Sequence, residues 1–311
     1  MSFEPPTTNQ RLQAIGSTDG IPETLKRALI PDKHFEPIPA PKAHDWLAVH
    51  PERGQTFDDF VKSKANRPGK KRSKIYLQPL GQFTKERSPS LESLRDYAAA
   101  YFGMKVEVLP TLDLAEAKLT TRTNQFTRNR QILTDDVLIF LKKKLPADAY
   151  CLLAITMEDL YPDESWNFVF GQASLRERVA VYSFARYDPA FYGQQRGKDY
   201  EKILLRRSCK VLVHETAHMF GILHCIYFRC VLNGSNHLQE SDARPMHLCP
   251  VCLRKLQHSI GFDMAKRYGN LYRFYQKAGF NEEARWTTER VHWILGEKAA
   301  RGILDEKKNA D

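Results

Sequence analysis

One stretch of the chain, residues 214–252, constrains the protein more than any other, because it holds two sets of metal-binding side chains end to end. The first set is the pattern H-E-x-x-H-x-x-G-x-x-H, which runs from His214 to His224. The second set is Cys-x4-Cys, a gap of 18 residues and Cys-x2-Cys, and its members are Cys225, Cys230, Cys249 and Cys252. Together the patterns predict two zinc sites, the first catalytic and the second structural.

The spacing of the first pattern suits a helix that presents two ligands to one ion. His214 and His218 are four residues apart, so on a helix they lie one turn apart on the same face. Glu215 follows the first histidine and is rotated from it by roughly 100° about the helix axis. It can therefore approach a water molecule at the metal without itself taking a coordination position.

The end of the pattern supplies the third ligand. Gly221 can adopt positive φ, so it is expected to end the helix and turn the chain, which brings His224 to the ion. Three protein ligands leave the fourth position of tetrahedral zinc open, as in a catalytic site, where the metal lowers the pKa of water to about 7. Glu215 is the predicted general base that takes the proton from this water.

The four cysteines, in two closely spaced pairs, suit a closed tetrahedral zinc site that stabilises the fold. Two alternatives remain, disulfide bonds and buried free thiols, and disulfides are disfavoured if the chain is cytosolic. His237 and His247 lie in the same loop and are alternative ligands, although four cysteines already complete the set. The other two cysteines, Cys151 and Cys209, are predicted to be buried core thiols.

Length and composition place the chain among ordinary globular proteins, and its 311 residues predict one or two domains. No apolar run approaches the roughly 18 residues of a membrane-spanning helix, and the first ten residues lack the apolar core of a signal peptide. We therefore expect an intracellular, cytoplasmic protein; the basic residues 70–74 leave the nucleus open as a second compartment. An intracellular location favours metal binding over disulfides.

Regular structure is predicted from residue 75 onward. Residues 1–74 contain nine of the 17 prolines and are expected to be an irregular, partly mobile extension, with one short helix possible over 23–30. Alternating or continuous apolar runs predict strands over 75–80, 104–109, 150–156, 166–174 and 179–185. Helical periodicity and capping signals predict helices over 90–102, 134–144, 200–220, 264–278 and 281–300.

The zinc-binding core resembles that of the metzincin metalloproteases. The cysteine directly after the third histidine, with the three further cysteines, resembles the archaemetzincin branch of that group. The flanking segments 166–171, 183–187 and 234–238 agree, and the similarity runs from about residue 45 to residue 262. The chain is more similar to the eukaryotic archaemetzincins than to the shorter prokaryotic ones.

This resemblance implies a metzincin-like α/β (α+β) fold, in which residues 75–311 form a single catalytic domain. A mixed twisted sheet with helices would form an upper subdomain, 75–221, which includes the active-site helix. A smaller lower subdomain, 222–311, would hold the Cys₄ zinc loop and the C-terminal helices. In the family pattern one antiparallel edge strand binds the peptide by strand addition, and either 166–174 or 179–185 can be that strand.

The implied function is that of a zinc metallopeptidase with two zinc ions, aminopeptidase-like on short peptides, whose partner is a peptide or protein substrate. An aminopeptidase needs a group that holds the α-ammonium of the substrate. Five carboxylates near the expected cleft are candidates for this role: Glu158, Asp159, Asp163, Glu164 and Asp188.

One departure from the family pattern supports an alternative function. The family has a methionine two residues after the second cysteine, where this chain has Leu232. Leucine is close to methionine in volume, so the packing role can survive. The alternative is a catalytically weak or inactive zinc scaffold that binds other proteins. Nucleic-acid binding is disfavoured because residues 225–252 are not notably basic. No membrane partner is expected, and the oligomeric state is left open.

Overall fold

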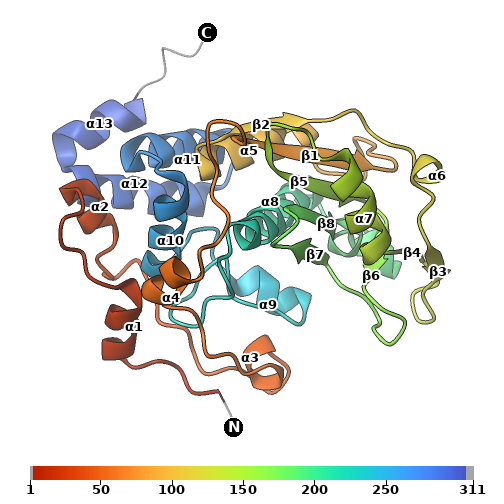
Figure 1. The fold of residues 1–311 in the computed structure, drawn as a ribbon, viewed down its shortest axis with the longest axis horizontal. Coiled ribbons are helices and arrows are strands. Elements are labelled where there is room, and N and C mark those ends of the chain that lie inside the picture. Colours follow the sequence, from red (N-terminus) through yellow and green to blue (C-terminus); the bar gives the residue numbers. More distant parts are fainter. Residues whose placement is uncertain (1–2, 306–311) are drawn as a thin grey trace. The chain divides into compact units, whose positions relative to one another are not determined.

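The computed structural model describes residues 3–305, which form two compact units. One unit, here called the sheet unit, consists of residues 66–99 and 104–220. The other, the helical unit, consists of the residues up to 65, the short segment 100–103 and the residues from 221 onward. Figure 1 labels the helices and strands of both units in chain order.

The sheet unit is built on a mixed five-stranded sheet with the strand order β2-β1-β5-β8-β7. Its strands are β1 (Lys74–Leu80), β2 (Lys105–Val108), β5 (Ala149–Thr156), β7 (Gly171–Ser174) and β8 (Val179–Ser183). The first four strands in this order are parallel, and β7 pairs antiparallel with β8 at the edge of the sheet. A smaller sheet has the order β3-β4-β6, with β3 (Thr121–Thr123), β4 (Arg130–Leu133) and β6 (Asp159–Tyr161).

Helices cover both faces of the large sheet, and every residue of the central strand β5 is buried. On one face, Leu152 and Ala154 belong to a core cluster with Val137 of α7 (Thr134–Lys144). The long helix α8 (Tyr200–Met219) also packs against β5, β7 and β8. The remaining helices of the unit are α5 (Leu91–Phe102), whose last residues belong to the helical unit, α6 (Leu114–Ala117), η1 (Ala185–Tyr187) and η2 (Pro189–Tyr192).

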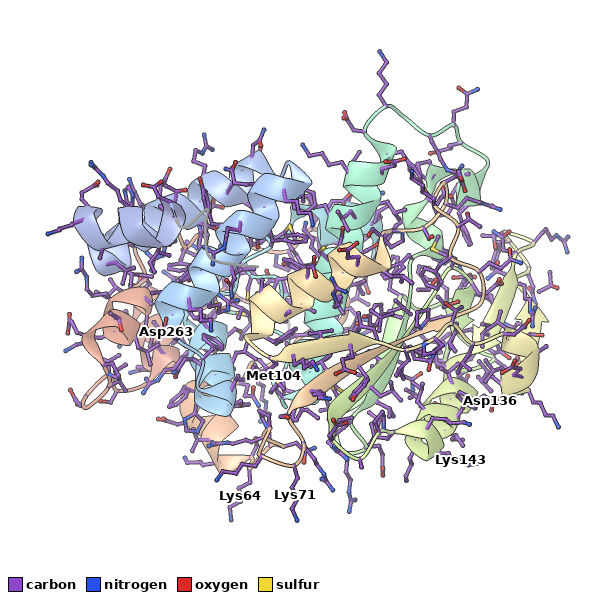
Figure 2. The ribbon with its side chains drawn as sticks, turned by 90° about the horizontal axis from the view of Figure 1, so that it is seen from above. Lys64, Lys71, Met104, Asp136, Lys143 and Asp263 are labelled. Atoms are coloured by element: carbon purple, nitrogen blue, oxygen red, sulfur yellow. The ribbon has the colours of Figure 1, made fainter. Side chains whose placement is uncertain are left out.

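The boundaries of α7 follow from its charges. Acidic residues occupy its first turn and lysines its last turn, as the helix dipole favours. Figure 2 labels one residue of each kind, Asp136 and Lys143. This helix coincides with the segment 134–144 predicted from the sequence.

The helical unit consists of short N-terminal helices packed against longer C-terminal ones. Its helices are α1 (Thr8–Ile15), α2 (Glu23–Ala28), α3 (Trp46–Val49), α4 (Phe57–Lys62), α9 (Leu238–Ala243), α10 (Pro250–Ile260), α11 (Met264–Ala278), α12 (Asn281–Leu295) and α13 (Glu297–Asp305). Helix α12 packs against α2, and α10 packs against both α1 and α4. Among residues 3–305, no helix is both long enough and apolar enough to cross a membrane.

The extension 1–74 contains more regular structure than predicted, and its residues 1–2 lie outside the described part; α2 overlaps the one short helix expected there. Four helices form there, and the segment packs around buried cations of the C-terminal helices. The side chain of Arg290 has no exposed surface; it donates to Asp32 at 2.7 Å and to the carbonyl of Ala28 at 3.0 Å. A buried charge is costly without such partners, so Arg290 requires the N-terminal segment to be ordered.

Two predicted elements differ in extent. Of the expected strand 166–174, only residues 171–174 form a strand, β7. Trp166 closes a turn with Asp163 and is half-exposed. The expected helix 281–300 is broken at Gly296, which has φ of +78° and separates α12 from α13. A positive φ is accessible to glycine at little steric cost, so this residue sets the break.

Candidate metal centres

Helix α8 of the sheet unit places two predicted zinc ligands side by side. The Nε2 atoms of His214 and His218 are 3.1 Å apart, and the two rings are perpendicular, with centroids 4.6 Å apart. Two imidazole nitrogens about 2.05 Å from a tetrahedral zinc ion would be separated by roughly 3.3 Å. The two rings therefore fit one zinc ion, and His214 is buried while His218 is partly exposed.

The general-base candidate, Glu215 of α8, directs its carboxylate toward the edge strand β7. A Cβ atom added to Gly171, the first residue of β7, would lie 3.3 Å from the carboxyl carbon of Glu215. The same atom would lie 2.9 Å from the Cβ of Tyr182 on β8. Any side chain at position 171 would crowd the carboxylate, so glycine is required there. Sequence reasoning missed this role, although a glycine at the start of a strand can mark a close backbone approach.

The carboxyl end of α8 is fixed by a tyrosine from the first half of β5. The hydroxyl of Tyr150 donates to the carbonyl of Met219 at 3.0 Å, and its ring stacks on Phe220 at 4.4 Å. This bond satisfies one of the carbonyls that every helix end leaves without an intrahelical partner. The next residue, Gly221, has φ of +76°, as its predicted role at the end of the helix requires.

The third histidine of the motif, His224, lies in the helical unit and is oriented there by a carboxylate. Its Nδ1 lies 2.8 Å from Oε1 of Glu52, and its ring packs edge-on against Trp46 at 5.1 Å. The indole of Trp46 donates to the same carboxylate oxygen at 2.7 Å. A proton on Nδ1 leaves the lone pair of His224 on Nε2, the tautomer that a metal ligand needs. No sequence signal pointed to Glu52.

All four cysteines of the second pattern converge within the helical unit. Their sulfur atoms lie within 4.8 Å of one another, all four residues are buried, and none forms a disulfide. The Sγ atoms of Cys225 and Cys249 are 3.5 Å apart. Sulfur ligands at 2.3 Å from a tetrahedral zinc ion would be roughly 3.8 Å apart, so the cluster has the size of a Cys₄ site.

The electrostatics of the cluster call for a cation. Burial opposes ionisation of Cys225, but hydrogen bonds from the other thiols outweigh it and lower the pKa of Cys225 well below that of a free thiol. Burial instead raises the pKa of Cys249, and the hydrogen bonds from Cys225 and Cys230 raise that of Cys252. Four buried thiolates cannot coexist unaided, and a divalent metal removes that obstacle.

The loop between the two cysteine pairs is held by an asparagine that sequence reasoning did not identify. Asn233 accepts from the backbone of Cys230 at 2.8 Å and donates to the carbonyls of Cys225 and Phe228 at 2.7 and 2.9 Å. Leu232, at the position of the family's methionine, is fully buried. Its carbonyl accepts from the backbone amide of Cys225 at 2.8 Å, which ties this residue to the start of the cysteine loop.

The two alternative histidine ligands have other partners. His247 stacks on Trp286 at 3.9 Å, and burial lowers its pKa to about 3. His237 caps α9 and lies 3.2 Å from Asp45. Asp45, His237 and Glu240 cluster closely enough to hold an ion, but backbone amides already occupy both carboxylate oxygens of Glu240. This third cluster is therefore explained by hydrogen bonds alone.

Several known proteins are similar to this chain in sequence. The model of peptidase family M54 matches residues 118–258. Archaemetzincin-2 of Mus musculus is 42% identical over 275 residues, covering 80% of this chain and 77% of the relative. Archaemetzincin-2 of Homo sapiens is 42% identical over 267 residues, covering 77% and 74%. The crystal structure of an archaemetzincin from Archaeoglobus fulgidus is 28% identical and covers 58% of this chain and 99% of its own, with a TM-score of 0.44.

The identity to the two relatives extends over about three quarters of the chain, well beyond the zinc-binding residues. It confirms the resemblance predicted from the motif, including its eukaryotic character, and with it the metzincin-like α/β fold. The chain belongs to the archaemetzincins, peptidase family M54, and is a zinc metallopeptidase of that family.

Proposed function

We propose that His214, His218 and His224 hold the catalytic zinc ion and that Glu215 is the general base. The proposal is supported by the motif, by the 3.1 Å separation of the first two ring nitrogens and by the tautomer that Glu52 sets on His224. When bound, zinc polarises the scissile carbonyl and lowers the pKa of the attacking water to about 7. A second zinc ion, held by the four cysteines, would stabilise the helical unit.

Glu215 would take the proton from the attacking water and pass it to the leaving amine. The single observation that carries this role is the space at Gly171, which lets the carboxylate lie beside the backbone of β7. β7 is an edge strand, and such a strand can pair with an extended peptide through its outward N–H and C=O groups. A peptide bound there would lie next to Glu215. This favours β7 over β8 as the substrate-binding strand, because β8 is paired on both sides.

The finer preference, for the free amino terminus of short peptides, is also a proposal, and it rests on the family resemblance. Of the five candidate carboxylates, four have side-chain partners: Asp159 with Arg186, Asp163 with Ser165, Glu164 with Arg122 and Asp188 with Arg196. The carboxylate of Glu158 makes no hydrogen bond or ion pair with any residue in the described part of the chain. The other four carboxylates are already paired within the chain, so none of those four is assigned to the α-ammonium of a substrate.

The test compares Glu215→Ala with Glu201→Ala, an exposed glutamate in the first turn of the same helix. Glu215→Ala should keep its zinc and lose at least about 10²-fold in turnover of a peptide, the usual scale of general acid–base catalysis. Glu201→Ala should match the wild type. Full activity of Glu215→Ala would contradict the mechanism. Equal rates on free and N-acetylated peptides would contradict the aminopeptidase preference alone.

A further inference from the structure

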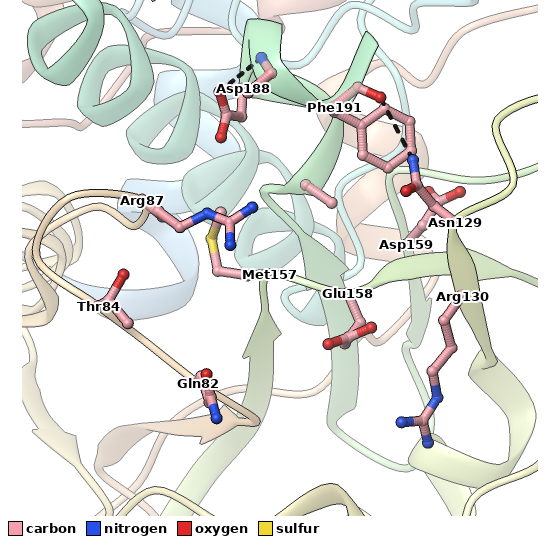
Figure 3. Close-up of a pocket in the computed structure, with 12 residues that line it drawn as sticks. Gln82, Thr84, Arg87, Asn129, Arg130, Met157, Glu158, Asp159, Asp188 and Phe191 are labelled. Carbon is pink, nitrogen blue, oxygen red and sulfur yellow. Dashed lines mark hydrogen bonds between the residues drawn. The ribbon is translucent and has the colours of Figure 1, made fainter. Parts of the chain in front are cut away.

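The sheet unit contains a cavity of about 260 Å³ whose lining includes none of the residues assigned to either zinc site. Figure 3 shows it, and its wall includes Gln82, Arg87, Arg130, Met157, Glu158 and Phe191. Ligand pockets for drug-sized molecules begin at roughly 300 Å³. The cavity therefore suits a single small metabolite and not a peptide.

The cavity lies where the topology of the sheet predicts a binding site. From β1 the chain passes through α5 to β2 on one side, and it later returns to place β5 on the other side of β1. The direction of winding therefore reverses between β1 and β5. Ligands of open α/β sheets bind outside the carboxyl ends of the strands at such a switch point. Gln82 and Arg87 follow the carboxyl end of β1, and Met157 and Glu158 follow that of β5.

Three charged side chains that face the cavity make no hydrogen bond or ion pair within residues 3–305. They are Arg87, Arg130 and Glu158, and Figure 3 shows the carboxylate of Glu158 between the two guanidinium groups in that view. Burial raises the pKa of Glu158, an effect that the charge of Arg130 opposes. Two cations and one anion that make no hydrogen bond or ion pair within the described residues, around one cavity, match a ligand that carries both charges.

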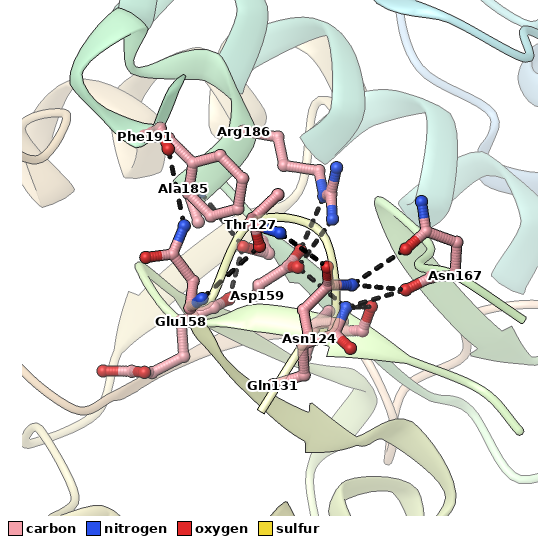
Figure 4. A network of polar contacts seen from close by, with 12 residues as sticks. Asn124, Thr127, Gln131, Glu158, Asp159, Asn167, Ala185, Arg186 and Phe191 are labelled. Atoms are coloured by element: carbon pink, nitrogen blue, oxygen red, sulfur yellow. Dashed lines mark hydrogen bonds and ion pairs between the residues drawn. The ribbon is translucent and has the colours of Figure 1, made fainter. Parts of the chain in front are cut away.

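The other two charged residues that line the cavity, Asp159 and Asp188, are already paired with arginines. Arg186 forms a two-point ion pair with Asp159, at 2.8 Å to each oxygen, and both side chains are buried. Gln131 donates to the same carboxylate at 2.8 Å, and this network is drawn in Figure 4. The adjacent Asp188 is paired with Arg196 at 2.6 Å. These groups are satisfied internally, so they do not compete for a ligand.

One wall of the cavity is apolar, and its aromatic residue, Phe191, is fixed by neighbouring side chains. The guanidinium of Arg186 lies 5.0 Å from the ring centre of Phe191, and the carbonyl of Phe191 accepts from Asn129 at 3.4 Å. Met157 and Ala190 line the cavity beside this ring. An apolar side chain of a ligand would find a preformed surface there, which is what small-molecule pockets provide.

We propose that this cavity binds a free α-amino acid with an apolar side chain. Its carboxylate would be held by Arg87 and Arg130, its ammonium by Glu158, and its side chain by Met157 and Phe191. Arginine pairs with carboxylates through directed, charge-assisted hydrogen bonds, and such bonds are stronger than neutral ones. A free amino acid is a product of peptide hydrolysis, so the occupancy of this cavity would rise as product accumulates. Binding itself does not depend on peptidase activity.

The test is calorimetric titration of the full chain with L-leucine. A ligand of this size with two charge-assisted contacts should bind with a dissociation constant on the order of 1 mM. N-acetyl-L-leucine lacks the ammonium and L-leucinamide lacks the carboxylate, so each should bind at least about tenfold more weakly. Glu158→Gln and Arg130→Gln should each weaken leucine binding by about tenfold, and Glu158→Gln should no longer distinguish leucine from N-acetyl-L-leucine.

Matched controls separate this site from the surface and from the catalytic centre. Glu86→Gln and Arg128→Gln change the same charges at neighbouring positions that do not line the cavity, so they should leave binding unchanged. His218→Ala should also bind leucine normally. Absence of binding at about 50 mM leucine, equal binding of the blocked analogues, or loss of binding in His218→Ala would each overturn the proposal. The last result would place leucine at the catalytic centre.

Discussion

At the residue scale, the third histidine of the motif depends on a carboxylate that lies 172 positions earlier in the chain. Glu52 fixes the tautomer of His224 through Nδ1 and is itself held by the indole of Trp46. Carboxylate partners of this kind orient a metal-bound imidazole and raise its basicity. The affinity of the catalytic site for zinc should therefore depend on a residue outside the motif.

Glu52→Gln tests this dependence. The amide keeps the size of the side chain but removes its negative charge, so the affinity for the catalytic zinc should fall by about 10- to 100-fold. Competition with a chelator measures the affinity, and Glu23→Gln, at an exposed position of α2, is the control. An unchanged affinity in Glu52→Gln would mean that His224 is not a ligand or that its orientation is set otherwise.

The sequence predicted the residues whose spacing carries the chemistry, and it could not predict those that support them. The histidines, Glu215 and the cysteines lie within 39 consecutive positions, 214–252, in patterns that few other functions need. Glu52, Gly171 and Asn233 act through contacts that arise only when distant segments fold together. A single sequence holds no record of such contacts.

At the element scale, the end of α8 is set by a glycine for two separable reasons. Gly221 has φ of +76°, and a Cβ atom added there would overlap the Cβ of Ala65. Gly261, at the end of α10, has φ of +77° but has no atom within 4 Å of the added Cβ. The two positions therefore differ in crowding and not in backbone conformation.

Alanine substitutions at Gly221 and Gly261 should therefore lower the free energy of unfolding by different amounts. Gly261→Ala should cost about 1 kcal/mol through the unfavourable backbone conformation. Gly221→Ala should cost about 1–3 kcal/mol more, because the methyl group must displace the segment that carries Ala65. Midpoints of urea unfolding measure both. Equal losses would show that the contact with Ala65 relaxes freely.

Elements with strong apolar patterns were predictable, and those held by buried polar contacts were not. The strand 149–156 is an unbroken apolar run, and α8, α11 and α12 have clear helical periodicity. Apart from α2, the short helices of the first 65 residues lack such patterns, and the segment is held by buried cations such as Arg290. Arginine and lysine are mostly exposed in proteins, so a sequence-based prediction assigns them to the surface. Segments that pack around a buried arginine are therefore not predicted.

At the scale of the whole molecule, we propose that the chain combines two metal sites of opposite character. The proposed histidine site would offer three nitrogen ligands and leave one position open, whereas the four cysteines lie together, buried, and offer four sulfurs. An open site suits catalysis, and a closed one suits stability. We therefore expect two zinc ions per chain, each of which can be removed without the other.

Zinc content per chain, determined by plasma mass spectrometry, tests this requirement most directly. The wild type should contain two zinc ions and His218→Ala one, while Cys249→Ser combined with Cys252→Ser should lose the other and lower the melting temperature. One zinc ion in the wild type, unaffected by His218→Ala, would contradict the account. Only the cysteine site would then be filled, and the chain would be a zinc scaffold rather than a peptidase.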